Sequence, residues 1–270
     1  YYNIRILDHD PVTSLVVKGL KNRSGKGMGV VELPIVSFLY TQRAWLRQGT
    51  EKSLCLADSQ VVRYLMLRRV SETAATGSHD GSVPGNDVRF PFQEHVWDDG
   101  AQCWFQWLLT KTGPLVRPLP AAFGKYYKRM VKRIKFNERW LLAHPKFTAK
   151  TLPFFHVNGK PLHRREIESE TRALLERAYV EEPGIGHLDI VRYRYNTHSE
   201  RRGGSVFYLS TVKGVEAFVR WLGNWKSLAF FSYAKVSRDY ATMSWKSILD
   251  VLKVVDAQPL ERLHGGASAD

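Results

Sequence analysis

The chain has 270 residues, 44% of them hydrophobic, which is enough to bury the core of one large domain or of one domain and a fragment. A formal net charge of +14 and a pI near 9.8 indicate a polyanionic partner, and because no apolar run reaches membrane-spanning length, nucleic acid is favoured over a membrane. Cys55, Cys103 and the scattered histidines form no disulfide framework or metal motif, so we expect no metal, no cofactor and a reducing intracellular compartment.

The first 31 residues are expected to lie outside the main domain. A short apolar segment, Leu15–Leu20, leads into the small, polar and basic stretch Asn22–Gly29, a composition typical of flexible linkers. Because the chain starts at Tyr1 without a methionine, it is interpreted as a piece of a longer protein.

Two helices are predicted next, one from Leu33-Pro34 onward and one that Asp58-Ser59 can cap. The apolar stripe of the second helix consists of Val61, Val62, Leu65, Met66 and Val70. Arg69 lies on this stripe, and a buried arginine needs a partner, so its side chain either extends to solvent or faces an anion.

A β-hairpin is predicted in the middle of the chain. Residues 73–100 are polar and indicate loops with one edge strand near Val88–Phe92. The aromatic-rich segment Gln102–Leu109 predicts a strand, Thr110–Pro114 a turn and Leu115–Arg117 a second strand. Lys111 then lies near the tip of this hairpin.

The most basic stretch, Gly124–Trp140, has the pattern of an amphipathic helix. Its apolar side is predicted to contain Tyr127, Val131 and Ile134. Such a helix can lie on a membrane, follow a phosphate backbone or present an ordinary solvated face, and we favour phosphate contacts. The predicted contacts to DNA are Lys125, Lys128, Arg129, Lys132, Arg133, Lys135 and, further along the chain, Arg202.

After this helix, Pro153–Leu162 predicts a strand, a turn and the start of another helix. That helix is expected to bury Ile167, Leu174, Leu175 and Ala178. Further helices are expected over about Ser199–Lys235, and a last amphipathic helix over about Ser244–Asp256.

The most informative motif is T-H-S-E-R-R-G-G at Thr197–Gly204, followed by L-G-N-W-K-S at Leu222–Ser227 and then by Tyr233. His198 and Arg201 lie three residues apart, so on a helix both can face one ligand and donate hydrogen bonds to a phosphate. A tyrosine can act as a covalent nucleophile.

These motifs resemble those of the tyrosine recombinases, the phage-integrase family, and most closely its eukaryotic, transposon-borne branch. Leu67–Glu72 is similar to the family's first arginine motif, with Arg69 as the shared arginine and Arg68 as the alternative register. Lys111-Thr112 matches the family's hairpin lysine, whereas Lys21 precedes the first arginine motif and does not.

The resemblance implies an α+β fold, mainly helical with a small antiparallel sheet, which is the catalytic core of the DNA breaking-rejoining enzymes. The implied domains are 1–31 (the tail of an N-terminal DNA-binding domain and a basic linker), 32–243 (the catalytic domain) and 244–270 (a C-terminal helix and a frayed tail). The last helix either covers its own domain or packs on a neighbouring protomer.

The implied activity is that of a site-specific recombinase or integrase of a transposable element, which cuts and rejoins DNA through a 3′-phosphotyrosine intermediate without metal or ATP. Arg69 and Arg201 would neutralise the phosphate, His198 would donate to it or help deprotonate the nucleophile, and Tyr233 would attack. Lys111 would protonate the leaving 5′ oxygen. Trp225 replaces the second histidine of many relatives and can donate through its indole N–H.

The implied partner is double-stranded DNA, bound by a homo-oligomer that forms a tetrameric synapse, in the nucleus if the host is eukaryotic and otherwise in the cytoplasm. A type IB topoisomerase-like DNA relaxer and a catalytically decayed or domesticated DNA-binding protein remain alternatives. No RNA-module motif supports RNA binding. Glu200 departs from the family pattern, in which an apolar residue is more usual at this position. An acidic side chain would weaken phosphate binding if it pointed into the site. Tyr240 is the alternative nucleophile.

Overall fold

The computed structural model describes residues 31–76, 89–110, 113–181, 194–211, 215–225, 250 and 252–253. Over these residues the protein is mainly helical, with a small antiparallel sheet. The α-helices are α2 (Ile35–Gln48), α3 (Glu51–Leu65), α4 (Lys125–Ala143), α5 (Arg164–Glu181), α7 (Thr197–Thr211) and α8 (Glu216–Gly223). The strands are β1 (Val96–Asp98), β2 (Gln102–Trp107), β3 (Leu115–Pro120), β4 (His156–Val157) and β5 (Lys160–Pro161). Within the described part of the chain, no helix is long and apolar enough to cross a membrane.

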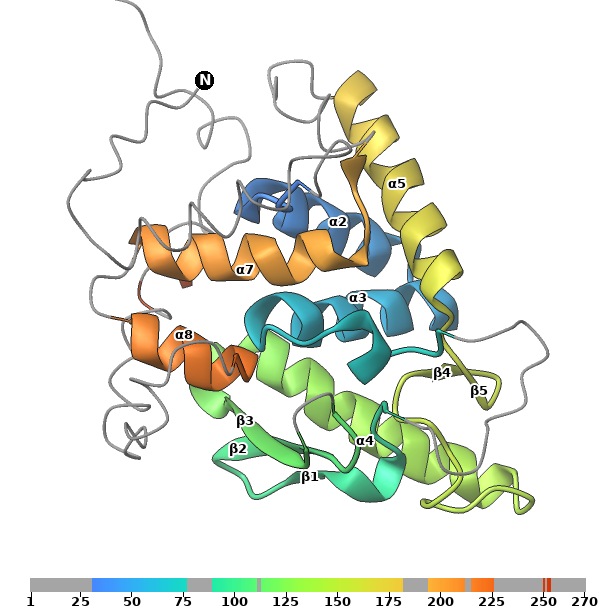
Figure 1. Ribbon diagram of the computed structural model, residues 1–270. Helices are drawn as coiled ribbons and strands as arrows, with labels where there is room; N and C mark the ends of the chain where they lie inside the picture. Colours follow the sequence, from blue (N-terminus) through green and yellow to red (C-terminus); the bar gives the residue numbers. More distant parts are fainter. Residues whose placement is uncertain are drawn as a thin grey trace, which may run out of the picture.

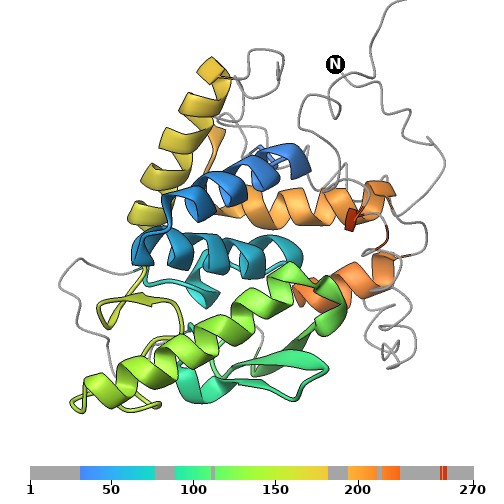
Figure 2. The ribbon, with the colours of Figure 1, turned by 180° about the vertical axis from the view of Figure 1, so that it is seen from behind.

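Helix α3 lies at the centre of the arrangement (Figures 1 and 2). Helices α2 and α7 run alongside one of its sides, and α4 crosses its other side above the three-stranded sheet. Helix α5 flanks α2 and α7. The hydrophobic core extends from these helices to the inner face of the sheet, where Phe105 and Trp107 are fully buried.

The predicted start of the second helix was wrong. Helix α3 begins at Glu51, because the Thr50 hydroxyl accepts a hydrogen bond from the Ser53 amide at 3.1 Å and caps it. Asp58 lies in the middle of this helix and is bound by arginines of α4 instead. The helix ends at Leu65, so Arg69 lies beyond it, at the N-cap of a 3-10 turn formed by Val70–Glu72.

The predicted hairpin is confirmed. Strands β2 and β3 pair antiparallel in the sheet order β1-β2-β3, and burial alternates along β2 as expected of a half-buried strand. Lys111 and Thr112, which follow β2, lie outside the described residues. The edge strand is β1 rather than Val88–Phe92, of which Val88 is not described and Phe92 forms a single bridge to Pro153.

The two glycines of the T-H-S-E-R-R-G-G motif let α7 approach its neighbours closely. A Cβ on Gly203 would overlap the carbonyl oxygen of Leu33, and one on Gly204 would overlap that of Tyr64 in α3. The Tyr208 hydroxyl donates to the Leu65 carbonyl at 2.5 Å, which fixes the end of α3 against the same helix. The motif therefore positions α7 as well as supplying polar side chains.

Glu200 does not face the predicted phosphate site. Its side chain is fully buried and forms an ion pair with Arg63 of α3, whose Nη2 lies 3.2 Å from Oε1. The Tyr195 hydroxyl donates to the same carboxylate at 2.9 Å, and Arg63 also donates to Ser59 at 2.9 Å. The Arg63 guanidinium balances the charge of this carboxylate, so Glu200 joins α7 to α3.

The buried face of α4 differs from the predicted one. It consists of Tyr126, Met130, Arg133, Ile134 and Asn137, while Tyr127 and Val131 are only partly buried. Arg133 and Asn137 are tolerated on this face because both have partners: Arg133 binds Asp58, and Asn137 binds Gln93, the Phe154 carbonyl and His156.

The elements after α4 follow the sequence prediction. Strands β4 and β5 form the expected turn around Asn158-Gly159, and α5 buries Ile167, Leu174, Leu175 and Ala178. Of the last predicted helix, Asp250, Leu252 and Lys253 are helical and Leu252 is buried, while the rest lies outside the described residues.

Candidate functional site

The structure brings Arg69, His198, Arg201 and Trp225 into one cluster at the end of α3. His198 and Arg201 lie one turn apart on α7, Arg69 follows α3, and Trp225 follows α8. Burial, and then the charges of Arg164, Arg201 and Arg69, lower the pKa of His198. The Arg201 guanidinium lies 4.3 Å from the centre of the Trp225 ring. Residues that are far apart in the sequence therefore surround one cationic centre.

Arg201 is the central cation of this cluster. Only 5% of the residue is exposed, and Nη2 donates to the Gly223 carbonyl at 2.6 Å. Nη1 is buried without a hydrogen-bond partner among the described residues. Burial, and then the charges of Arg68 and Arg69, lower the pKa of the guanidinium to about 9. A buried N–H group that has no partner and is surrounded by positive charges can donate a strong hydrogen bond to an anion.

Arg68 and Arg69 occupy different environments. The Arg69 side chain is 23% exposed and its Nη1 lies 3.1 Å from a carboxylate oxygen of Glu72. Arg68 is fully buried, donates to the Met66 carbonyl at 2.8 Å and to the Leu222 carbonyl, and faces the ring of Trp107. Burial lowers the pKa of Arg68 to about 10. Of the two registers, Arg69 is the one whose guanidinium reaches the surface.

His198 is exposed at the start of α7, and its backbone amide donates to Asn196 at 2.8 Å. The surrounding protein, followed by the charges of Arg164 and Arg201, lowers the pKa of the imidazole from its ordinary value. At neutral pH the ring is therefore uncharged, and it can donate one hydrogen bond and accept another.

Gly223 and Trp225 fit closely together at the end of α8. A Cβ on Gly223 would overlap the Trp225 ring, so a larger residue at this position would displace the indole. Asn224 between them adopts a left-handed conformation with φ 53°, and the Trp225 amide donates to the Arg220 carbonyl at 3.1 Å. This turn places the Trp225 indole against the Arg201 guanidinium.

Sequence reasoning missed Arg117 and Trp221. Arg117 donates from Nε at 3.2 Å and from Nη2 at 2.8 Å to the Trp221 carbonyl, and its guanidinium lies 4.2 Å from the centre of the Trp221 ring. Burial, and then the charge of Arg68, lower its pKa to about 9. The available signal was strand register, because Arg117 pairs directly with the buried Phe105 and so shares its face of the sheet.

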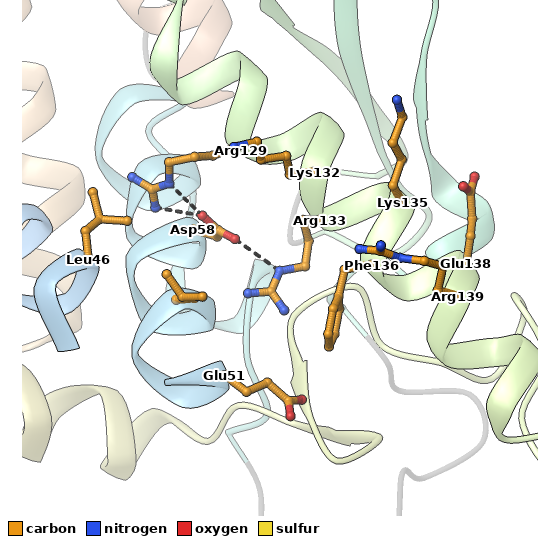
Figure 3. A pocket seen from close by; sticks show the side chains of 11 residues that line it. Leu46, Glu51, Asp58, Arg129, Lys132, Arg133, Lys135, Phe136, Glu138 and Arg139 are labelled. Carbon is orange, nitrogen blue, oxygen red and sulfur yellow. Dashed lines mark hydrogen bonds and ion pairs between the residues drawn. The ribbon is translucent and has the colours of Figure 1, made fainter. Parts of the chain in front are cut away.

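The predicted DNA contacts on α4 fall into two groups. Arg129 and Arg133 turn towards Asp58 and form ion pairs with it at 2.7 Å and 3.0 Å. All three side chains line a hollow of about 990 Å³ between α3 and α4 (Figure 3). The four lysines, Lys125, Lys128, Lys132 and Lys135, are exposed. Arg202 on α7 is half-buried.

Two of the predicted catalytic residues, Lys111 and Tyr233, lie outside the described residues.

Comparison with models of known protein families gives no match, and comparison with curated proteins gives no significant similarity.

Proposed function

We propose that the protein is a tyrosine-type DNA strand transferase, a recombinase or integrase that cuts and rejoins DNA through a 3′-phosphotyrosine intermediate. The proposal rests on the order of the sequence motifs and on the cluster of Arg69, His198, Arg201 and Trp225.

The observation that carries the proposal is the excess of buried positive charge at the end of α3. Arg68 and Arg201 are both buried, and each has an Nη1 atom without a hydrogen-bond partner in the described part of the chain. Among the residues that the structure describes, Glu72 is the acidic group that approaches Arg68 and Arg69, at 3.8 Å and 3.1 Å. Burying several cations around one carboxylate is costly unless a further anion balances them, and a phosphodiester has the matching charge and oxygen geometry.

In the proposed reaction the phosphate oxygens accept hydrogen bonds from Arg69 and Arg201, which balance the charge of the phosphorane as it forms. The uncharged His198 donates to a phosphate oxygen or accepts the proton of the nucleophile. The Tyr233 oxygen forms a bond to phosphorus while the bond to the 5′ oxygen breaks, and Lys111 gives that oxygen a proton. Attack by a 5′ hydroxyl reverses these steps and releases the tyrosine, so no external energy source is required.

Helix α4 supplies a suitable surface for the duplex. Its four exposed lysines can follow a phosphate backbone, whereas Arg129 and Arg133 hold α4 on α3 through Asp58. We therefore assign sequence-independent DNA contacts to the lysines and a structural role to the two arginines.

A nicked duplex that loses a short fragment after cleavage, and so traps the covalent intermediate, tests the proposal. The unaltered protein should form an adduct that resists denaturant, and Arg201→Lys should lower its rate at least ~100-fold, because lysine keeps the charge but loses the fork of donors. Arg139→Lys, the same change on an exposed part of α4, should react normally. If the unaltered protein binds DNA but gives no adduct on any such substrate, the protein is a binder and the proposal is wrong. Relaxation of supercoiled DNA without strand exchange would identify the topoisomerase-like alternative.

A further inference from the structure

Three arginines from three separate elements bind three successive carbonyl groups at the end of α8. Arg117 of β3 binds the Trp221 carbonyl, Arg68 after α3 binds the Leu222 carbonyl, and Arg201 of α7 binds the Gly223 carbonyl. Each guanidinium also faces an indole ring, at 4.2 Å for Trp221, 5.2 Å for Trp107 and 4.3 Å for Trp225, respectively. We call Arg68, Arg117 and Arg201 the arginine clamp.

The clamp is placed where a helix most favours cations. The last carbonyl groups of a helix lack partners within the helix, and the helix dipole makes this end negative. Helix α8 lies between α7 and strand β3 (Figure 1), so arginines from both can reach it. Its last carbonyls are therefore the polar groups that hold the three cations close together.

The same contacts determine which atoms of Arg201 are available. Nη2 is committed to the Gly223 carbonyl and one face of the guanidinium is covered by Trp225. Nη1 has no partner among the residues that the structure describes. The orientation of that donor thus depends on where the end of α8 lies, which Arg117 and Arg68 fix through the two preceding carbonyls.

We propose that Arg117 is a positioning residue of the phosphate site: by holding the Trp221 carbonyl it fixes the end of α8, and thereby aims Nη1 of Arg201 at the bound anion. This inference rests on the proposed function only in taking the anion to be a phosphate. It adds a residue from the three-stranded sheet to a site otherwise built from α7 and the segments after α3 and α8.

Phosphate binding measured without any DNA chemistry tests this assignment. The full chain is labelled with 5-fluorotryptophan, and Trp225→Phe identifies the ¹⁹F signal of Trp225. Inorganic phosphate, titrated at constant ionic strength against chloride, should shift this signal in a saturable way in the unaltered protein. Arg201→Gln should abolish the saturable shift.

Arg117→Gln should weaken phosphate binding about tenfold, because the end of α8 is no longer held. Arg117→Lys should recover part of the affinity, since an ammonium can still donate to the Trp221 carbonyl but not through two nitrogens. Arg139→Gln is the matched control, because it removes the same charge from an exposed position on α4 and should leave the affinity unchanged. Thermal unfolding of each variant shows that it is folded at the temperature of the titration.

The outcomes separate this inference from the proposed function. Unchanged phosphate affinity in Arg117→Gln, or an equal loss in Arg139→Gln, would overturn the positioning role while leaving the anion site intact. No saturable response in the unaltered protein would overturn the anion site itself, and with it both proposals. A normal phosphate response in a protein that never forms a covalent adduct with DNA would support the clamp and refute strand transfer alone.

Discussion

Replacing Glu200 by glutamine should destabilise the protein strongly, although the two side chains have nearly the same shape. The carboxylate is fully buried, pairs with the equally buried Arg63, and accepts a hydrogen bond from Tyr195 at 2.9 Å. Glutamine keeps an oxygen for Tyr195 but removes the negative charge. The Arg63 guanidinium would then be buried without a counter-ion.

The expected loss in the free energy of unfolding is about 3–5 kcal/mol, the range found when one partner of a buried ion pair is removed. The hydrogen bonds from Arg63 to Ser59 and Thr73, at 2.9 Å and 3.3 Å, remain but do not neutralise the charge. Replacing both partners by methionine should recover most of the loss, because neither charge is then buried.

Urea denaturation followed by tryptophan fluorescence measures this loss and its recovery in the double variant. Glu176→Gln, which removes the same charge from an exposed position on α5, is the control and should change stability by less than about 0.5 kcal/mol. A loss of less than about 1 kcal/mol for Glu200→Gln would refute the assignment of the pair as the main polar link between α3 and α7.

Three further outcomes follow from the structure. Reversing the charges of Lys128 and Lys132 should flatten the slope of log affinity for DNA against log salt by about 2, and an unchanged slope would remove α4 from the interface. Burial lowers the pKa of His156 from 6.5 to about 4, so the unfolded chain takes up a proton at a higher pH than the folded protein does. The free energy of unfolding should therefore decrease by about 3 kcal/mol in all as the pH falls from 6.5 towards 4. Urea unfolding of His156→Gln should lack this dependence. Gly204→Ala should cost about 1–3 kcal/mol by forcing α7 away from α3, and a calorimetric midpoint equal to that of the unaltered protein would contradict the close approach of the two helices.

The parts of the fold that the sequence predicts well are those with a strong local signal. Alternation along Gln102–Trp107 identifies a half-buried strand, and the apolar spacing from Ile167 to Ala178 identifies the buried face of α5. The start of α3 was mispredicted, because both Thr50 and Asp58 are good capping residues. What decides between them is the pairing of Asp58 with Arg129 and with Arg133, which lie far along the chain.

The site shows the same division. The spacing of His198 and Arg201 predicts their common face, and the motif that contains Arg69 predicts a nearby cation. Arg117 carries no local signal, because its role depends on the register of β3 against β2 and on the position of the end of α8. The inward turn of Arg129 and Arg133 likewise depends on a carboxylate from another helix. Lys111 and Tyr233 remain predictions from the sequence.

The central claim is that Tyr233 is the nucleophile of a DNA strand transferase, and mapping the covalent adduct tests it most directly. The adduct trapped on a nicked duplex is digested with protease and nuclease, and the modified tyrosine is identified by mass spectrometry. We predict a nucleotide on Tyr233, no adduct with Tyr233→Phe despite near-normal DNA affinity, and an undiminished adduct with Tyr240→Phe. An adduct that survives Tyr233→Phe and disappears with Tyr240→Phe would contradict the claim.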